Sequence, residues 1–168
     1  SGTLRLLLAT APVWVAAVLA VLAGVSICQA TEPHEACNHV DQPNDKAKCY
    51  YGIARDTRPL VAEMRERIHA LEPTPVAAMY AAFTAYIDPT LKAQVFEQEI
   101  VVVLKRLEVA GLYTEFARAL GLYIRFLGNE GQSAKALDLY NEAKSLPFSE
   151  MDRLPLNLDL GRGASATR

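Results

Sequence analysis

An apolar run near the start of the chain constrains its fold more than any other feature. Residues 6–28 read LLLATAPVWVAAVLAVLAGVSIC and contain no charged side chain. A helix needs about 20 apolar residues to cross a hydrocarbon layer about 30 Å thick, whereas a secretory signal has an apolar region of about 7–15 residues. We therefore predict that residues 1–30 form a transmembrane anchor with a short N-terminal flank. Because Cys28-Gln29-Ala30 resembles a cleavage site, an exported chain cut after Ala30 is the alternative.

The residues on either side of this run predict its orientation. Arg5 precedes the run, whereas the acidic residues Glu32 and Glu35 follow it. Positively charged flanks usually stay on the side from which a membrane protein is inserted. We therefore expect a single-pass protein with its N-terminus in the cytosol, matrix or stroma. The rest of the chain would then lie in the intermembrane space, periplasm or lumen.

Two cysteines, Cys37 and Cys49, flank the polar segment CNHVDQPNDKAKC. Thiols on the far side of such membranes tend to be oxidised, and a disulfide between these two would close a loop of about a dozen residues and contribute about 3 kcal/mol. His34 and His39 add two possible metal ligands, although the spacing of the four residues matches no common zinc pattern. The sequence favours the disulfide and leaves a metal site or free thiols as alternatives.

Helical periodicity dominates the chain after a polar segment, residues 31–46, that is rich in Pro, Asp and Asn and predicts a linker. In residues 47–150, apolar side chains recur at helical spacing between capping residues. Thr74-Pro75 is typical of a helix start, and Gly111 of a helix end. These features predict an all-α domain, a small bundle of helical hairpins. The expected helices cover approximately residues 46–56, 57–71, 75–87, 90–110, 112–127 and 132–146.

One of these helices, residues 75–87, is apolar nearly all round. Such a helix either occupies the centre of its domain or packs against another subunit. We favour the central position and keep Met79 and Phe83 as candidate contacts with a partner.

The last two expected helices carry the residues of a repeat hairpin. These residues are a glycine at the turn, a small residue at the helix crossing and apolar residues on the facing sides, namely Gly131, Ala136, Leu120, Leu127, Tyr140 and Ala143. With them, residues 117–150 resemble one tetratricopeptide- or pentatricopeptide-type unit, which implies a protein-binding scaffold and no RNA code. The repeat length of that family is about 34 residues. A step of that length upstream meets Val102 and Arg106, so no second copy is expected and an ordinary helical hairpin is the alternative.

The final segment, residues 151–168, has no helical pattern. Its leucines alternate with polar residues or proline, at Leu154, Leu156, Leu158 and Leu160. A period of two predicts an extended segment with one apolar edge, which has no core of its own. We expect this tail to contact another chain through the four leucines. The alternative is that the leucines pack on the surface of this domain.

Sequence motifs of catalysis are missing. The chain contains no nucleophile elbow, P-loop, dinucleotide fingerprint or HExxH motif. His69 fits a residue at the edge of a helix, and Glu97 and Glu99, two positions apart, do not share a helix face. Lys and Arg number 17 and Asp and Glu 19, a balance that disfavours nucleic-acid binding. We therefore expect no enzyme activity, cofactor, metal, nucleic acid or small-molecule substrate.

Taken together, these features predict a non-catalytic accessory subunit of a multisubunit membrane complex. Its partners would be the lipid bilayer and other subunits, which the helical domain and tail would stabilise. The expected membrane is an energy-converting one, above all the mitochondrial inner membrane with its respiratory-chain or ATP synthase complexes. The alternatives are an exported or membrane-tethered helical binding module of tetratricopeptide type and a thylakoid subunit with a lumenal domain.

Overall fold

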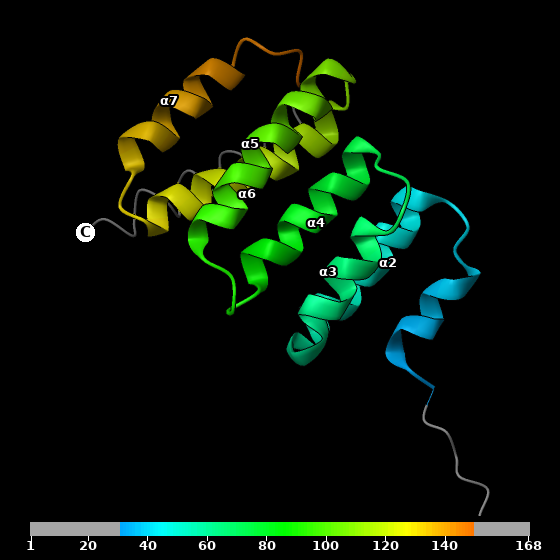
Figure 1. Cartoon of the computed structure of the whole chain (residues 1–168). Helices are drawn as coiled ribbons and strands as arrows, with labels where there is room; N and C mark the ends of the chain where they lie inside the picture. The colour runs from blue at the N-terminus through cyan, green and yellow to red at the C-terminus, as the bar shows by residue number, and fades with distance from the viewer. Residues whose placement is uncertain (1–30, 150–168) are drawn as a thin grey trace, which may run out of the picture. The chain divides into compact units, whose positions relative to one another are not determined.

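Residues 31–149 are described by a computed structural model, and every regular element among them is a helix (Figure 1). The all-α prediction is therefore confirmed for this part of the chain. The elements are η1 (Pro33–His39), α2 (Pro43–Asp56), η2 (Arg58–Leu60), α3 (Val61–His69), α4 (Pro75–Ile87), α5 (Ala93–Val109), α6 (Tyr113–Asn129) and α7 (Ser133–Ala143).

The predicted membrane anchor and the predicted extended tail lie outside the described residues. Among residues 31–149, no helix combines the length and the apolar character that a membrane crossing requires.

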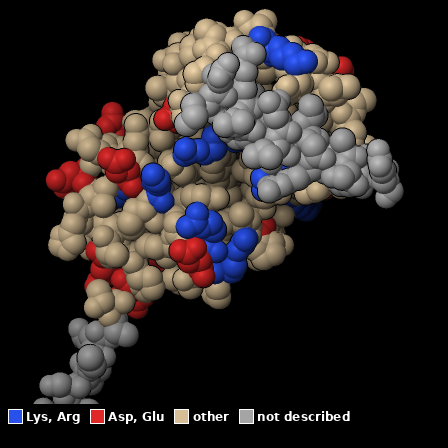
Figure 2. Space-filling model, turned by 180° about the vertical axis from the view of Figure 1, so that it is seen from behind, with Lys and Arg blue, Asp and Glu red and all other residues tan. Residues whose placement is uncertain are grey.

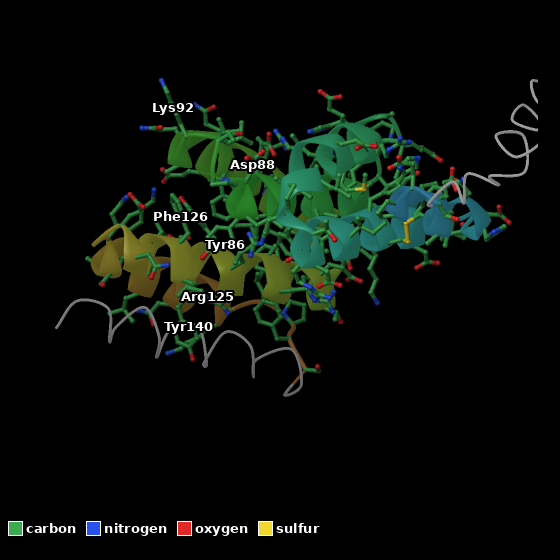
Figure 3. The ribbon with its side chains drawn as sticks, turned by 90° about the horizontal axis from the view of Figure 1, so that it is seen from below. Tyr86, Asp88, Lys92, Arg125, Phe126 and Tyr140 are labelled. Atoms are coloured by element: carbon green, nitrogen blue, oxygen red, sulfur yellow. A yellow bond between two sulfur atoms is a disulfide. The ribbon has the colours of Figure 1, made fainter. Side chains whose placement is uncertain are left out.

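The α-helices of the described part form three helical hairpins stacked in chain order. In these hairpins α2 packs on α3, α4 on α5, and α6 on α7. Each hairpin packs on the next, because α4 contacts both α2 and α3, and α6 contacts α5 and, less extensively, α4. Seen from below, α2 and α6 lie on one side of the stack and α3 and α5 on the other (Figure 3). Stacked helix pairs that contact only their neighbours are the architecture of helical solenoids.

The spacing of the hairpins explains why the sequence indicated one of them. The hairpin predicted from residues 117–150 is present as α6 and α7, and two further hairpins precede it. Their first helices begin at Pro43, Pro75 and Tyr113, so the steps are 32 and 38 residues. A search at a fixed step of about 34 residues falls out of register in both cases.

Helix α4 is the centre of the stack. Its nine buried residues include Met79, which is fully buried, and Phe83, which is 4% exposed. The helix starts as the sequence predicted, since the Ala77 amide donates to Thr74 Oγ1 at 3.0 Å and Pro75 occupies the first turn. The predicted central position of this helix is thus confirmed. The prediction that Met79 contacts a partner is wrong, because its side chain is fully buried within the stack.

A glycine follows the last turn of α5, between the second and third hairpins, and another follows the last turn of α6, inside the third hairpin. Gly111 and Gly131 have φ angles of 69° and 74°, a left-handed conformation that side chains with a Cβ disfavour. The amide that follows each glycine donates to the carbonyl five residues earlier, at 3.0 and 2.7 Å. This is the hydrogen bond of a Schellman motif, so the prediction of Gly111 as a helix end is confirmed.

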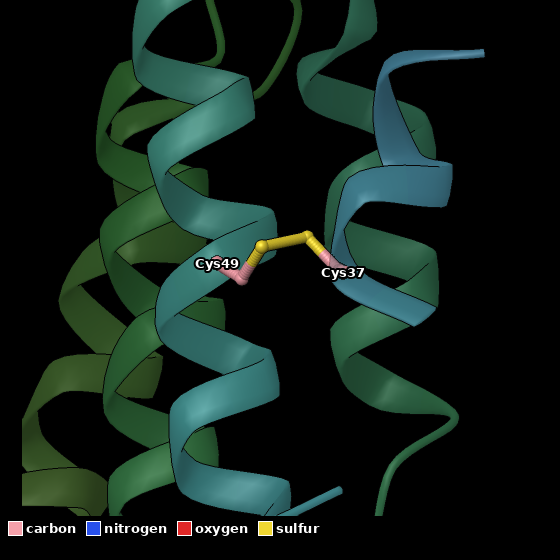
Figure 4. Close-up of a disulfide and its surroundings, with 2 residues drawn as sticks. All are labelled: Cys37 and Cys49. Atoms are coloured by element: carbon pink, nitrogen blue, oxygen red, sulfur yellow. A yellow bond between two sulfur atoms is a disulfide. The ribbon is translucent and has the colours of Figure 1, made fainter. Parts of the chain in front are cut away.

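The predicted linker, residues 31–46, is largely helical, so that prediction is wrong. It contains η1 and the first turn of α2. A disulfide between Cys37 and Cys49 fastens η1 to α2, with an S–S distance of 2.05 Å and a Cα–Cα distance of 5.8 Å (Figure 4). The disulfide prediction is confirmed. Cys37 is fully buried, and its disulfide fixes η1 against α2. The sequence of this segment is polar and has no helical periodicity, so its helical structure could not be predicted from a local pattern.

Candidate functional site

A groove of about 660 Å³ runs across the first helices of the three hairpins. Helix α4 supplies its floor, and α2 and α6, which lie on the same side of the stack, supply its walls (Figure 3). The residues that line it are Asp45, Lys48, Cys49, Tyr51, Gly52, Arg55, Tyr80, Phe83, Arg118, Leu122 and Arg125.

Three aromatic rings form an apolar surface within this groove. The ring centroids of Tyr51, Tyr80 and Phe83 lie 5.5 to 5.9 Å from one another, in tilted and edge-to-face contacts. Burial raises the pKa of the Tyr51 and Tyr80 hydroxyls above its usual value, so both stay neutral. The Tyr80 hydroxyl accepts a hydrogen bond from Arg118 at 3.3 Å. The groove therefore offers apolar area together with neutral hydrogen-bonding groups.

Basic side chains surround the aromatic rings. The groove is lined by four of them and by one acidic side chain, Asp45, whereas the whole chain carries more acidic than basic residues. In the view from behind, Lys and Arg gather in the middle of one face (Figure 2). The basic side chains that line the groove are Lys48, Arg55, Arg118 and Arg125. A concave surface on which basic side chains outnumber acidic ones favours ligands with negative charge.

Gly52 of α2 keeps one wall of the groove open. A Cβ atom at this position would meet no other atom within 4 Å. Glycine inside a helix costs about 1 kcal/mol relative to alanine, because it loses more backbone freedom on folding. Since Gly52 lines the groove, any side chain placed there would project into open space within it.

The four residues of the alternative metal site, His34, Cys37, His39 and Cys49, are not gathered around one point in the structure. Cys37 and Cys49 are consumed by the disulfide, and Cys49 instead lines the groove. His34 Nδ1 lies 3.4 Å from Glu63 Oε1, and His39 ends η1. Among residues 31–149, no three potential ligands of the His, Cys, Asp or Glu type gather around one point.

Other charged clusters hold the hairpins together. Arg65 of α3 forms a two-point ion pair with Glu99 of α5 and also donates to the Ala81 carbonyl of α4 at 3.1 Å. His69 lies nearby, and burial, assisted by the positive charge of Arg65, lowers its pKa. Arg65 thus joins α3 to both α4 and α5.

A second cluster joins the last three helices. Glu97 of α5 accepts hydrogen bonds from Tyr123 of α6 at 2.9 Å and from Lys135 of α7 at 2.7 Å. Glu97 and Glu99 therefore face different partners, as their spacing predicts. This cluster links α5, α6 and α7, and none of its three residues lines the groove.

Sequence reasoning missed the groove residues because they come from helices far apart in the chain. Lys48 and Arg55 on α2 and Arg118 on α6 each resemble an ordinary solvated charge when their own helix is read alone. Only the irregular hairpin register brings them together. Of the predicted partner contacts, Phe83 lines the groove, and the four leucines of the tail lie outside the described residues.

Comparisons with protein-family models, with curated proteins and with solved structures return no match to this chain. A function is therefore inferred from the chemistry of the groove itself.

Proposed function

We propose that the helical domain is a non-catalytic binding module that holds an extended, acidic polypeptide segment in the groove across α2, α4 and α6. The observation that carries this proposal is the combination of an aromatic floor with basic walls in one open groove. Apolar side chains of the ligand would pack on the rings, and its carboxylates would meet the lysine and arginine side chains.

The dimensions of the groove favour a chain segment. Packed helices lie about 8–10 Å apart, so a groove across three of them is about 20 Å long. An extended chain advances about 3.3 Å per residue, so about six residues would fill it. Ion pairs at a surface contribute about 0.2–1 kcal/mol each, and buried apolar area about 25 cal/mol per Å². We therefore expect affinities in the micromolar range that weaken as salt is added.

The disulfide supports a location in an oxidising compartment, because cytosolic thiols are normally kept reduced. The accessory-subunit function expected from the sequence depends on residues 1–30 and 151–168, which lie outside the described residues. It stays a prediction, as do the membrane and the complex to which the subunit would belong.

The proposal is tested by fluorescence anisotropy with the full chain and labelled ten-residue peptides. The probe alternates Glu with Leu, and two comparison peptides alternate Glu with Ser or Lys with Leu. Binding of the Glu-Leu peptide at micromolar concentration is expected, with weaker binding of both others. Equal binding of all three peptides, or of none, would contradict the proposal.

Three substitutions at Gly52 locate the binding in the groove. Gly52→Ala adds one methyl group and should bind the Glu-Leu peptide as the unmodified chain does. Gly52→Gln should weaken binding about tenfold by filling the groove. Gly52→Glu, of the same size, should weaken it about two- to fivefold further by repelling carboxylates. Identical affinities for the Ala, Gln and Glu variants would place the peptide elsewhere.

A further inference from the structure

The chain itself contains a segment whose chemistry matches the groove. We propose that residues 150–160 occupy the groove and compete with an external ligand, so that the tail regulates access to the site. The occupancy stands on the observations below, whereas its regulatory consequence rests on the proposed function.

The path of the chain after α7 leads back to a helix of the groove. The Phe148 ring lies 5.9 Å from the ring of Phe116 and 6.2 Å from that of Tyr113, both on α6. Leu146 and Phe148 also pack against the buried core. The last described residues are therefore anchored on α6, the helix that supplies Arg118 and Leu122 to the groove.

Residues 150–160 are long enough to reach the groove from the end of the described chain. Residues 150–160 would span about 36 Å when extended, at about 3.3 Å per residue. A helix with its side chains is about 10–12 Å across, so the segment is long enough to pass around α6 and continue across the groove.

The order of residues in this segment complements the groove. In an extended chain, alternate residues share an edge. The even-numbered positions carry two acids followed by four leucines, namely Glu150, Asp152, Leu154, Leu156, Leu158 and Leu160. One edge would thus present carboxylates to the basic side chains and leucines to Tyr51, Tyr80 and Phe83. The odd-numbered edge carries Met151, Arg153, Pro155, Asn157 and Asp159 and has no run of leucines to pack on the rings.

The occupancy is tested by photo-crosslinking in the full chain. Benzoylphenylalanine is placed at Leu122, which lines the groove, and in a separate variant at Val102, which lies on α5 and is 58% exposed. Irradiation of the Leu122 variant should give a product of monomer mass, with the link mapped by mass spectrometry to residues 150–160. The Val102 variant should give no such link. A product of twice the mass would assign the groove to a second copy, and no link from Leu122 would overturn the proposal.

Tail substitutions test the same proposal without altering the groove. Leu156→Ser with Leu158→Ser removes the apolar edge, whereas Met151→Ser with Asn157→Ser changes the opposite edge. If the tail covers the groove in about 90% of molecules, the first variant should bind the Glu-Leu peptide about tenfold more tightly. The second should bind as the unmodified chain does. Equal affinity of both variants would overturn the competition.

The two proposals fail separately. A crosslink to residues 150–160 without peptide binding by any variant would retain the tail in the groove and remove the external ligand. Peptide binding that the tail substitutions leave unchanged, without a crosslink, would retain the proposed function and remove the tail.

Discussion

At the residue scale, Gly52 disfavours the helix in which it lies and has open space beside its Cα atom. It lies inside α2, where glycine is a poor helix former, and nothing fills the space beside it. Alanine at this position would favour the helix, and a side chain larger than alanine would also reduce the open volume of the groove. The groove around it is lined mainly by charged and aromatic residues, so a large side chain at position 52 would change which ligands can enter the groove.

We predict that Gly52→Ala raises the free energy of unfolding by about 1 kcal/mol, because alanine loses less backbone freedom in a helix and its methyl group meets no neighbour. Urea unfolding followed by circular dichroism measures the change. Gly131→Ala serves as the contrasting substitution. Its φ of 74° strains any side chain, so a loss of stability is expected there. A destabilised Gly52→Ala variant would contradict the assignment of open space at this position.

A second prediction concerns the carboxylate of Glu97. Hydrogen bonds from Lys135, and secondarily from Tyr123, lower the pKa of Glu97 below its usual value of 4.5. A carboxyl group with a depressed folded-state pKa stabilises the fold above its unfolded pKa and loses this contribution as pH falls through the folded value. Glu97→Gln should therefore cost at most about 1 kcal/mol at pH 7, because the side chains of Glu97 and Lys135 are 29% and 48% exposed and water screens the pair.

The difference between Glu97→Gln and the unmodified chain should shrink as pH falls below about 4.5. Urea unfolding at pH 7 and at successively lower pH values measures it. Glu108→Gln is a matched comparison, because Glu108 pairs with the exposed Lys105 at 3.5 Å, and little change is expected at either pH. A constant difference across the whole pH range for Glu97→Gln would contradict the role of its ionised form.

At the scale of elements, the disulfide determines whether η1 stays packed against the first hairpin. It fastens η1 to α2, and Cys49 also lines the groove. Covalent closure of a short loop removes freedom from the unfolded chain more than it adds contacts to the folded one. Reduction should consequently act on η1 and α2 before it affects the distant third hairpin.

We predict that reduction of the Cys37–Cys49 bond lowers the free energy of unfolding by about 3 kcal/mol. Urea unfolding with and without a phosphine reductant measures the loss. A Cys37→Ala, Cys49→Ala variant should start from the lower stability and show no response to the reductant. An unmodified chain whose unfolding midpoint is the same under both conditions would contradict this prediction.

The elements also show where sequence reasoning succeeds. Thr74-Pro75 and Gly111 act through hydrogen bonds within a few residues, so local sequence predicts the ends of their helices. The fold of residues 31–46 depends on a covalent tie to α2, and the groove depends on three helices in an irregular register. Neither of these two features produces a recognisable pattern among residues that are neighbours in the sequence. The helices could thus be predicted from the sequence, whereas their stacking and the candidate site could not.

At the scale of the whole described domain, stability is expected to be uneven. In a stack of hairpins each helix is stabilised mainly by packing on its immediate neighbours. A helix at the end of the stack therefore has fewer contacts than a central one. Helix α4 has nine buried residues and packs on two hairpins, whereas α7 buries Ala136 and Ala143 and packs mainly on α6. The third hairpin should therefore open more readily than the centre.

We predict that native-state hydrogen exchange is fastest in α7 and slowest in α4, because local opening of α7 exposes little apolar area. Amide exchange followed by mass spectrometry, below the unfolding transition, measures the order. Ala82→Gly in the buried centre of α4 should accelerate exchange in α4 and leave exchange by the local opening of α7 unchanged, whereas Ala136→Gly should accelerate exchange in α7. Equal exchange in α4 and α7 would indicate a single cooperative unit. With the predicted order, the segment proposed to cover the groove follows the helix that opens most easily, so its release would not require the central hairpin to unfold.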